Sequence, residues 1–250
     1  MSAKNEIQIY SKVRVSEISG EIDDYEDSIF QNVIRNREIF LIQNELCVAK
    51  PKLILDYGCG GGWLSLLIYN WGFNVIGIDV TAYLLKKAKI TCPNVDFIIS
   101  DAEKLPFKNT IFDFIIGISI LHHLDLINSC KELFKVSCKG SKFIFMEPNV
   151  LNPLSAIGRK LFPMNTHTKG EKGYYIKNLL KMLSFLGYHI DKYFMLFFLT
   201  FPVARFFKII NKKPHISLLK MISLLEKCME KIPIINHLNS TIIIVGKKFK

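Results

Sequence analysis

The sequence predicts an α/β fold built on a doubly wound, mostly parallel sheet with helices on both faces. The first observation is a series of short apolar runs typical of buried strands, at residues 53–56, 74–79, 95–99, 112–118 and 142–147. The second is the helical spacing of apolar residues between several of these runs, over 63–69, 81–90 and 127–138. Strands joined through crossover helices run parallel, so the alternation favours a parallel sheet.

Helical and strand-like patterns also occur outside this central region. Residues 25–47 place apolar side chains at helical spacing ahead of the first strand. Beyond residue 147 we expect a helix, a strand, two amphipathic helices around Pro214 and a final β-branched strand, over 175–186, 188–199, 203–231 and 241–245.

The order of these segments predicts the domain organisation. We expect an N-terminal helical cap over residues 1–49 and a main domain over 50–250. Residues 148–173 contain three prolines and several polar residues, which predict an active-site loop at 150–173. A helical insertion is expected at 200–238, before the last strand.

Positive charge is concentrated in the C-terminal part of the chain. The net charge is +11; residues 1–150 carry 16 Lys/Arg against 18 Asp/Glu, whereas residues 151–250 carry 17 against 4. A cationic half rich in Phe, Leu and Ile suits an anionic partner, a membrane surface or nucleic acid. Lysine-rich solvent faces of amphipathic helices are the structural alternative.

Several functional classes lack support in the sequence. The first residues are polar and do not form a signal peptide, and no apolar run approaches the ~20 residues that span a bilayer. The six cysteines are scattered, without a C-x-x-C pair or a histidine at metal-ligand spacing. We therefore expect a cytoplasmic protein with reduced thiols and no metal site.

A glycine-rich turn, DYGCGGGW, follows the first predicted strand and precedes a helix. Such a turn suits a polar or anionic ligand at the helix N-terminus. A phosphate loop would need Gly-Lys-Ser/Thr, but Trp63 follows Gly62. A dinucleotide site would need G-x-G-x-x-G, and Trp63 occupies its third glycine position. Asp79 ends the second strand 21 residues after Gly58, where an acidic side chain can accept both hydroxyls of a ribose.

Five blocks in order resemble the class I S-adenosylmethionine-dependent methyltransferases, in their type 11 small-molecule branch. They are LDYGCGGG (55–62), VIGIDVT (75–81), DAEKLPF (101–107), FDFIIGISILHHL (112–124) and GSKFIFMEPN (140–149). The resemblance covers about residues 50–150. It implies a Rossmann-like sheet of seven strands with the last strand antiparallel, S-adenosyl-L-methionine as cofactor, and methyl transfer by direct displacement.

The resemblance also implies which residues bind the cofactor. The backbone of Gly58, Cys59, Gly60 and Gly62 would pass under its methionine part, supported by Asp56. Asp79 would hold the ribose, with Val80 packing on the adenine. Asp101 would contact the adenine amino group, with Ala102 beside the ring. Ile118 and Ser119, at the end of the fourth strand, would border the transferable methyl. Simple structural roles stay open, with Asp101 as a helix cap and Asp56 as a hydrogen-bond acceptor.

The nature of the acceptor decides whether a base is needed. A hydroxyl or activated carbon must lose a proton, whereas a carboxylate or thiolate need not. His122, Glu147 and His167 are the candidate bases, and Glu147 lies where ligands collect at the carboxyl ends of strands. Candidate substrate contacts are Asn149, Asn152, Arg159 and His167.

The aromatic segment 193–207, followed by lysines, favours a hydrophobic or lipid-linked acceptor met at a membrane surface. An ordinary core strand and packed helix is the alternative. We expect O- or C-methylation of a small-molecule or lipid-linked acceptor, with peripheral membrane contact through the basic aromatic C-terminal half. The rival hypotheses are an RNA or protein methyltransferase and a non-catalytic cofactor-binding scaffold. We do not expect a nucleic-acid partner, because the sequence has no recognisable RNA-binding module.

Overall fold

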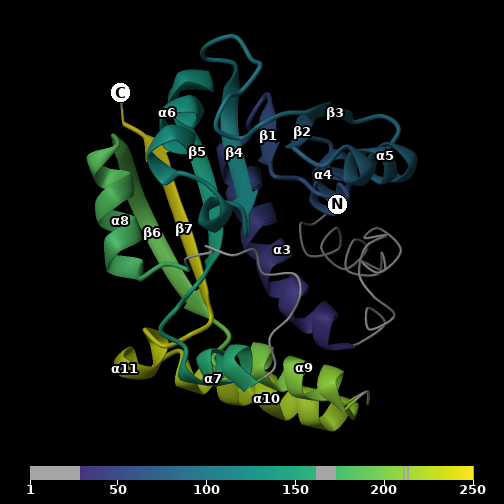
Figure 1. Ribbon diagram of the computed structural model, residues 1–250, viewed down its shortest axis with the longest axis vertical. Helices are drawn as coiled ribbons and strands as arrows, with labels where there is room; N and C mark the ends of the chain where they lie inside the picture. Colours follow the sequence, from purple (N-terminus) through teal and green to yellow (C-terminus); the bar gives the residue numbers. More distant parts are fainter. Residues whose placement is uncertain (1–28, 162–172, 211, 213, 250) are drawn as a thin grey trace.

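A single seven-stranded sheet organises the protein (Figure 1). The computed structural model describes residues 29–161, 173–210, 212 and 214–249. The strand order is β3-β2-β1-β4-β5-β7-β6. The strands are β1 (Ile54–Tyr57), β2 (Val75–Asp79), β3 (Asp96–Ile99), β4 (Phe112–Ile118), β5 (Ser137–Pro148), β6 (Tyr188–Leu196) and β7 (Thr241–Lys248).

Strands β1 to β5 pair in parallel, and β7 pairs antiparallel with both β5 and β6. Strand β6 therefore runs in the same direction as β1 to β5. This arrangement confirms the predicted doubly wound sheet with an antiparallel last strand.

Apolar cores lie on both faces of the sheet, which explains the continuous apolar runs in the sequence. Adjacent residues of β5 alternate between the cores: Phe143 and Phe145 pack on one face, and Ile144 and Met146 pack on the other. The first face is covered by α6 (Leu126–Val136) and α8 (Ile176–Phe185). The second is covered by α3 (Ile29–Ala49) and α4 (Trp63–Asn70), and α5 (Ala82–Thr91) flanks β2 and β3.

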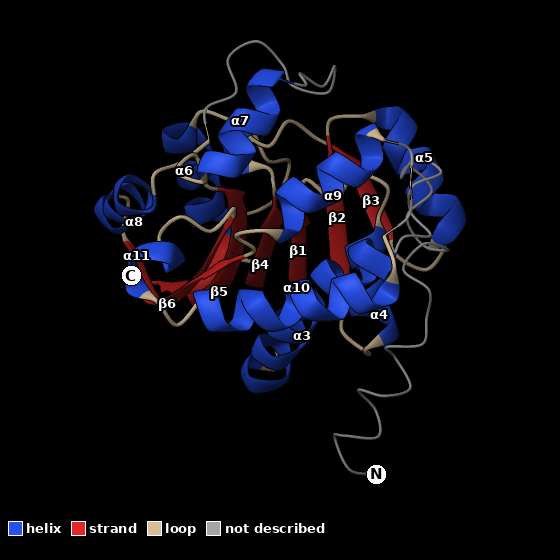
Figure 2. Cartoon of the chain, turned by 90° about the horizontal axis from the view of Figure 1, so that it is seen from below, coloured by secondary structure: helices blue, strands red, loops and turns tan. Residues whose placement is uncertain are grey.

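A layer of helices lies at the edge of the sheet where the parallel strands end (Figures 1 and 2). It consists of α7 (Pro153–Leu161), α9 (Thr200–Ile209), α10 (Ile216–Met229) and α11 (Pro233–Asn236). Helix α7 follows the end of β5. The other three helices connect the end of β6 to the start of β7, and both of these points lie at the same edge. We call this set of helices the edge layer.

Two glutamates of the edge layer hold it in place. Glu226 of α10 is 1% exposed and accepts hydrogen bonds from the backbone N–H groups of Phe198 and Leu199 and from Thr200, where α9 begins. Glu230 accepts two hydrogen bonds from the guanidinium of Arg37 on α3, at 2.8 and 2.7 Å. These contacts join the edge layer internally and to the helix before β1.

The segment predicted as a loop at 150–173 contains helix α7 over its first part. The Asn152 side chain accepts a hydrogen bond from the Ser155 N–H at 2.7 Å, which is the geometry of a helix N-cap, and Pro153 occupies the first turn. An asparagine followed by proline is a local start signal, so this helix was predictable from the sequence. Strand β5 also begins earlier than expected, at Ser137, because Ser137 pairs with Phe112.

Within the described ranges, no helix is long and apolar enough to cross a membrane.

Candidate active site at the carboxyl ends of the strands

The glycine turn leaves β1 in a conformation that requires glycine. Gly58, Gly60 and Gly62 have φ angles of +75°, +51° and +78°, in the left-handed region. A Cβ atom on Gly58 would lie 2.8 Å from Ile120, and one on Gly62 would lie 2.7 Å from the Cβ of Ala88. At Gly60 the same atom would meet nothing within 4 Å. The backbone of Gly60 is therefore the part of the turn that a ligand can approach closely, whereas Gly58 and Gly62 are required for packing.

Asp79 joins the end of β2 to this turn. Its Oδ2 accepts from the Gly60 N–H at 3.0 Å, and its Oδ1 accepts from the Thr81 N–H at 2.8 Å. Each carboxylate oxygen has a second lone pair, so the group can accept further hydrogen bonds from ligand hydroxyls. These two acceptor oxygens fit the ribose hydroxyls of S-adenosylmethionine.

An apolar platform lies beside Asp79. Val80 is 72% exposed, Ile99 ends the neighbouring strand and is also exposed, and Ala102 is a buried residue of the turn that follows β3. Asp101 accepts from the Glu103 N–H at 2.8 Å in a turn, and no helix begins there, so Asp101 is not a helix cap. Exposed aliphatic groups next to a carboxylate fit a flat purine ring with its amino group.

The last two predicted cofactor residues, Ile118 and Ser119, lie at the end of β4. Ile118 is half-buried, and Ser119 is exposed with a φ of +54°, a left-handed conformation that is costly for serine. The N–H of Ser119 donates to the carbonyl of Met146 at 2.7 Å, which ties β4 to β5 at this point. Strained residues of this kind concentrate at functional sites.

Glu147 accepts hydrogen bonds from the segment that follows β4, residues 120–122. The side chain is 1% exposed. One oxygen accepts from the N–H groups of Ile120 and Leu121, and the other accepts from the His122 N–H and lies 2.7 Å from His122 Nδ1. Both oxygens are therefore occupied, and Glu147 orients His122 instead of acting as the base that its position suggested. His122 keeps Nε2 for another partner, because the carboxylate favours the tautomer with the proton on Nδ1.

Asp56, in β1 just before the glycine turn, is buried and hydrogen-bonded to α4. It is 3% exposed and accepts from the Ser65 hydroxyl of α4 at 2.6 Å. Burial raises the pKa of this carboxyl to about 7 from 3.8, and the Ser65 hydrogen bond opposes that rise. Asp56 thus joins the strand before the glycine turn to the helix after it, as a structural hydrogen-bond acceptor. Ser65, nine residues later on a helix, gave no signal of this pairing in the sequence.

Replacing Asp56 with asparagine is expected to remove a pH dependence of folding. Between pH 3.8 and about 7 the native state binds more protons than the unfolded state, so the free energy of unfolding falls as pH rises through this window. A neutral asparagine should stabilise the protein at pH 8 by on the order of 2 kcal/mol relative to wild type. Urea unfolding at pH 5 and pH 8 measures this; equal pH dependence in the two proteins would contradict the assignment.

Two predicted substrate residues have internal partners instead. The Asn149 amide donates to the carbonyls of His237 and Asn239 and accepts from Leu151 N–H. The Asn152 amide donates to the carbonyls of Phe198 and Leu238. Both side chains are at most 1% exposed, and their hydrogen bonds tie the edge layer to the end of β5.

The remaining predicted residues differ in how far the structure describes them. His167 lies outside the described residues, and only the backbone of Arg159, in α7, is described. Cys59 is buried, and burial raises the pKa of its thiol, so it is a packing residue of the turn.

Tyr174 was not predicted from the sequence. Its hydroxyl donates to the carbonyl of Leu121 at 2.9 Å, next to His122. Among the described residues, no group of three or more His, Cys, Asp or Glu could hold a metal ion.

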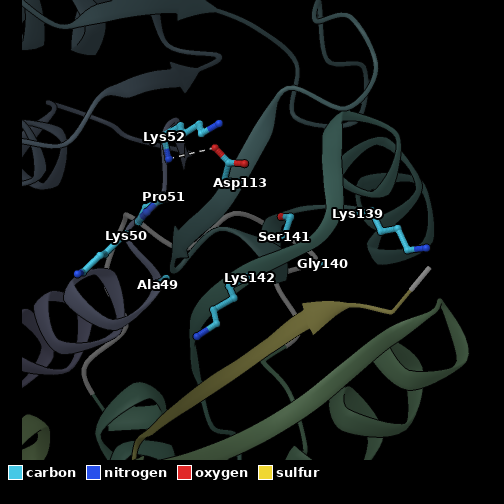
Figure 3. A pocket seen from close by; sticks show the side chains of 9 residues that line it. All are labelled: Ala49, Lys50, Pro51, Lys52, Asp113, Lys139, Gly140, Ser141 and Lys142. Atoms are coloured by element: carbon cyan, nitrogen blue, oxygen red, sulfur yellow. Dashed lines mark hydrogen bonds between the residues drawn. The ribbon is translucent and has the colours of Figure 1, made fainter.

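A lysine-lined pocket of about 260 Å³ lies at the other end of the sheet, where β1, β4 and β5 begin (Figure 3). In Figure 3 Lys50 and Lys142 extend to one side of the pocket, and Lys52 and Lys139 extend to the other. Asp113 accepts from the backbone N–H groups of Lys52 and Leu53. The pocket therefore lies at the opposite end of the sheet from the glycine turn and Asp79.

The comparisons with known proteins concern the domain and its fold. Residues 55–145 match the model of a methyltransferase domain. An uncharacterised protein, MJ1252, of Methanocaldococcus jannaschii is 30% identical over 136 residues, which are 52% of each chain. A demethylmenaquinone methyltransferase of Renibacterium salmoninarum is 32% identical over 111 residues, 43% of this chain and 46% of that protein.

The chain thus spans about half the length of these curated relatives. The crystal structure of a SAM-dependent methyltransferase from Archaeoglobus fulgidus superposes with a TM-score of 0.57 at 20% identity, over 88% of this chain and 98% of that one. That likeness concerns the fold. Residues 55–145 therefore form a methyltransferase domain, and the sheet that contains them has the fold of the S-adenosylmethionine-dependent methyltransferases.

Proposed function

We propose that the protein transfers a methyl group from S-adenosylmethionine to a hydrophobic or lipid-linked small-molecule acceptor, by O- or C-methylation. The observation that carries the proposal is the row of Gly60, Asp79, Val80 and Ser119 along one edge of the sheet, next to His122. The sulfonium of the cofactor supplies an activated methyl group. The protein has to bind, orient and, where the acceptor carries a proton, remove it.

Each part of the proposed cofactor site has a separate task. Asp79 would accept the ribose hydroxyls, and the open backbone at Gly60 would let the methionine part approach. Val80 and Asp101 would hold the adenine by packing and by accepting from its amino group. Ile118 and Ser119 would border the space in which the acceptor meets the methyl.

His122 is the proposed general base. Its Nδ1 lies 2.7 Å from Glu147, which leaves the Nε2 lone pair as the proton acceptor. Glu147 is a positioning residue, since it contacts His122 and the backbone of the same turn. A base of this kind suits a hydroxyl or an activated carbon, in line with O- or C-methylation.

Two observations support a hydrophobic acceptor. One relative is named for demethylmenaquinone, a quinone. The edge layer, which borders the carboxyl ends of the strands, presents many apolar side chains to solvent, among them Ile157, Phe206 and Leu224.

Replacing Asp79 with alanine tests the cofactor site. We expect the affinity for S-adenosylmethionine to fall at least about tenfold, because the ribose loses its charged acceptor and the glycine turn loses the Gly60 hydrogen bond. Isothermal titration calorimetry measures the affinity. Asp96→Ala, an exposed aspartate at the opposite end of the sheet, is the matched control and should bind as the wild type does. Equal affinities of the wild type and Asp79→Ala would refute the site.

A further inference from the structure

The outer face of α10, in the edge layer, exposes a group of apolar side chains. Towards the protein, α10 buries Leu219, Ile222 and Glu226. On the opposite side, Met221, Leu224 and Leu225 are 53%, 65% and 44% exposed. Their spacing of three and four residues places them on one stripe of the helix. A helix that is apolar on both its inner and its outer face needs a second partner.

Positive charge borders this apolar stripe. Lys220 and Lys227 are exposed and, being seven residues apart, lie on the same flank of α10. Residues 200–238 contain seven Lys/Arg against two glutamates, Glu226 and Glu230. Both carboxylates are already engaged, Glu226 by the start of α9 and Glu230 by Arg37. Neither is therefore available to neutralise the lysines at the surface, and the face is both apolar and cationic.

We propose that the outer face of α10 docks the protein on an anionic lipid bilayer. Met221, Leu224 and Leu225 would enter the boundary between headgroups and acyl chains, and Lys220 and Lys227 would contact lipid phosphates and carboxylates. This division of side chains is the one that interfacial amphipathic helices use.

Two other occupants fit the face less well. A second copy packed antiparallel through this stripe would place the lysine flanks against each other, which opposes that symmetric dimer. RNA would pair with the lysines, but its phosphates and bases gain little from Met221 and Leu224, which offer no stacking surface. The bilayer satisfies both the apolar and the basic side chains.

The position of this face gives it a consequence for catalysis. Helix α10 belongs to the edge layer, at the same end of the sheet as Asp79, Ser119 and His122 (Figures 1 and 2). A bilayer against α10 would therefore lie on the active-site side of the protein, where a lipid-linked acceptor is embedded. This link to methyl transfer rests on the proposed function, whereas docking on the bilayer does not.

Co-sedimentation with vesicles tests the docking face. The probes are vesicles of phosphatidylcholine alone and vesicles in which about a third of the lipid is phosphatidylserine. The wild type should bind the anionic vesicles at low salt and release them as salt rises. Met221→Gln/Leu224→Gln should bind at least about tenfold more weakly. Lys220→Gln/Lys227→Gln should lose a similar factor and most of the salt dependence.

The controls change the same side-chain types elsewhere. Ile90→Gln/Phe185→Gln removes two exposed apolar side chains on α5 and α8, and Lys139→Gln/Lys142→Gln removes two lysines at the opposite end of the sheet (Figure 3). Both should bind vesicles as the wild type does. The proposal is overturned if the wild type does not bind anionic vesicles, or if the control variants lose as much affinity as the docking-face variants. Salt-sensitive binding of RNA in place of vesicles would also overturn it.

Calorimetry with S-adenosylmethionine separates this inference from the proposed function. Docking-face variants should keep the affinity of the wild type for S-adenosylmethionine, because none of these side chains belongs to the cofactor site. Vesicle binding without cofactor binding would refute the proposed function alone, and cofactor binding without vesicle binding would refute the docking face alone.

Discussion

Replacing His122 with alanine is expected to lower the rate of methyl transfer by about 10²-fold or more and to leave the affinity for S-adenosylmethionine nearly unchanged. The reason is that His122 lies outside the row of cofactor residues, and Glu147 holds its Nδ1 at 2.7 Å so that Nε2 remains the proton acceptor. The measurement is transfer of a labelled methyl group from S-adenosylmethionine into the organic-soluble fraction of a cell extract. Calorimetry of cofactor binding on the same variant separates catalysis from folding.

His123→Ala is the matched control for this variant. The two histidines are neighbours in the short 3-10 helix η1 (Leu121–His123), but Nδ1 of His122 lies 2.7 Å from Glu147, and His123 is more exposed than His122. His123→Ala should therefore transfer methyl groups at close to the wild-type rate. Equal activity of the two variants would exclude His122 as the base and would favour an acceptor that is already ionised, such as a carboxylate or thiolate.

Replacing Glu226 with alanine should lower the free energy of unfolding by about 3–5 kcal/mol. Its carboxylate accepts from three successive backbone N–H groups, those of Phe198, Leu199 and Thr200, and from the Thr200 hydroxyl. With Glu226 and Thr200 at most 3% exposed, these donors would be left without a partner and largely shielded from water. The carboxylate also lies at the N-terminus of α9, where negative charge is favourable.

Urea unfolding of Glu226→Ala measures this loss, and Glu230→Ala is its control on the same segment. Glu230 pairs with Arg37 near the surface, with a side chain 17% exposed, so its removal should cost only about 1 kcal/mol. Glu226→Gln keeps the shape but turns an amide towards the same donors, and it should fall between the two. A loss in Glu226→Ala no larger than that in Glu230→Ala would contradict the anchoring role.

Local patterns predicted most of the fold because each strand is buried on both faces. A run such as residues 112–118 is apolar at almost every position, since Phe114 and Ile116 face one core and Phe112 and Ile115 face the other. The helix at 153–161 was missed although its start, Asn152-Pro153, is a local signal. The polar and proline-rich composition around it favoured a loop instead.

The sequence by itself determined the sheet, the glycine turn and the position of Asp79, because apolar spacing and turn residues act between near neighbours in the chain. Only the tertiary structure decided which polar side chains are available for chemistry. The carboxylate of Glu147 accepts hydrogen bonds from the turn that contains His122, 25 residues earlier in the chain. Asn149 and Asn152 donate to carbonyls more than 40 residues away. None of the three therefore keeps its predicted role. A buried polar group must find partners wherever the fold brings them, and that choice depends on the assembled edge of the sheet.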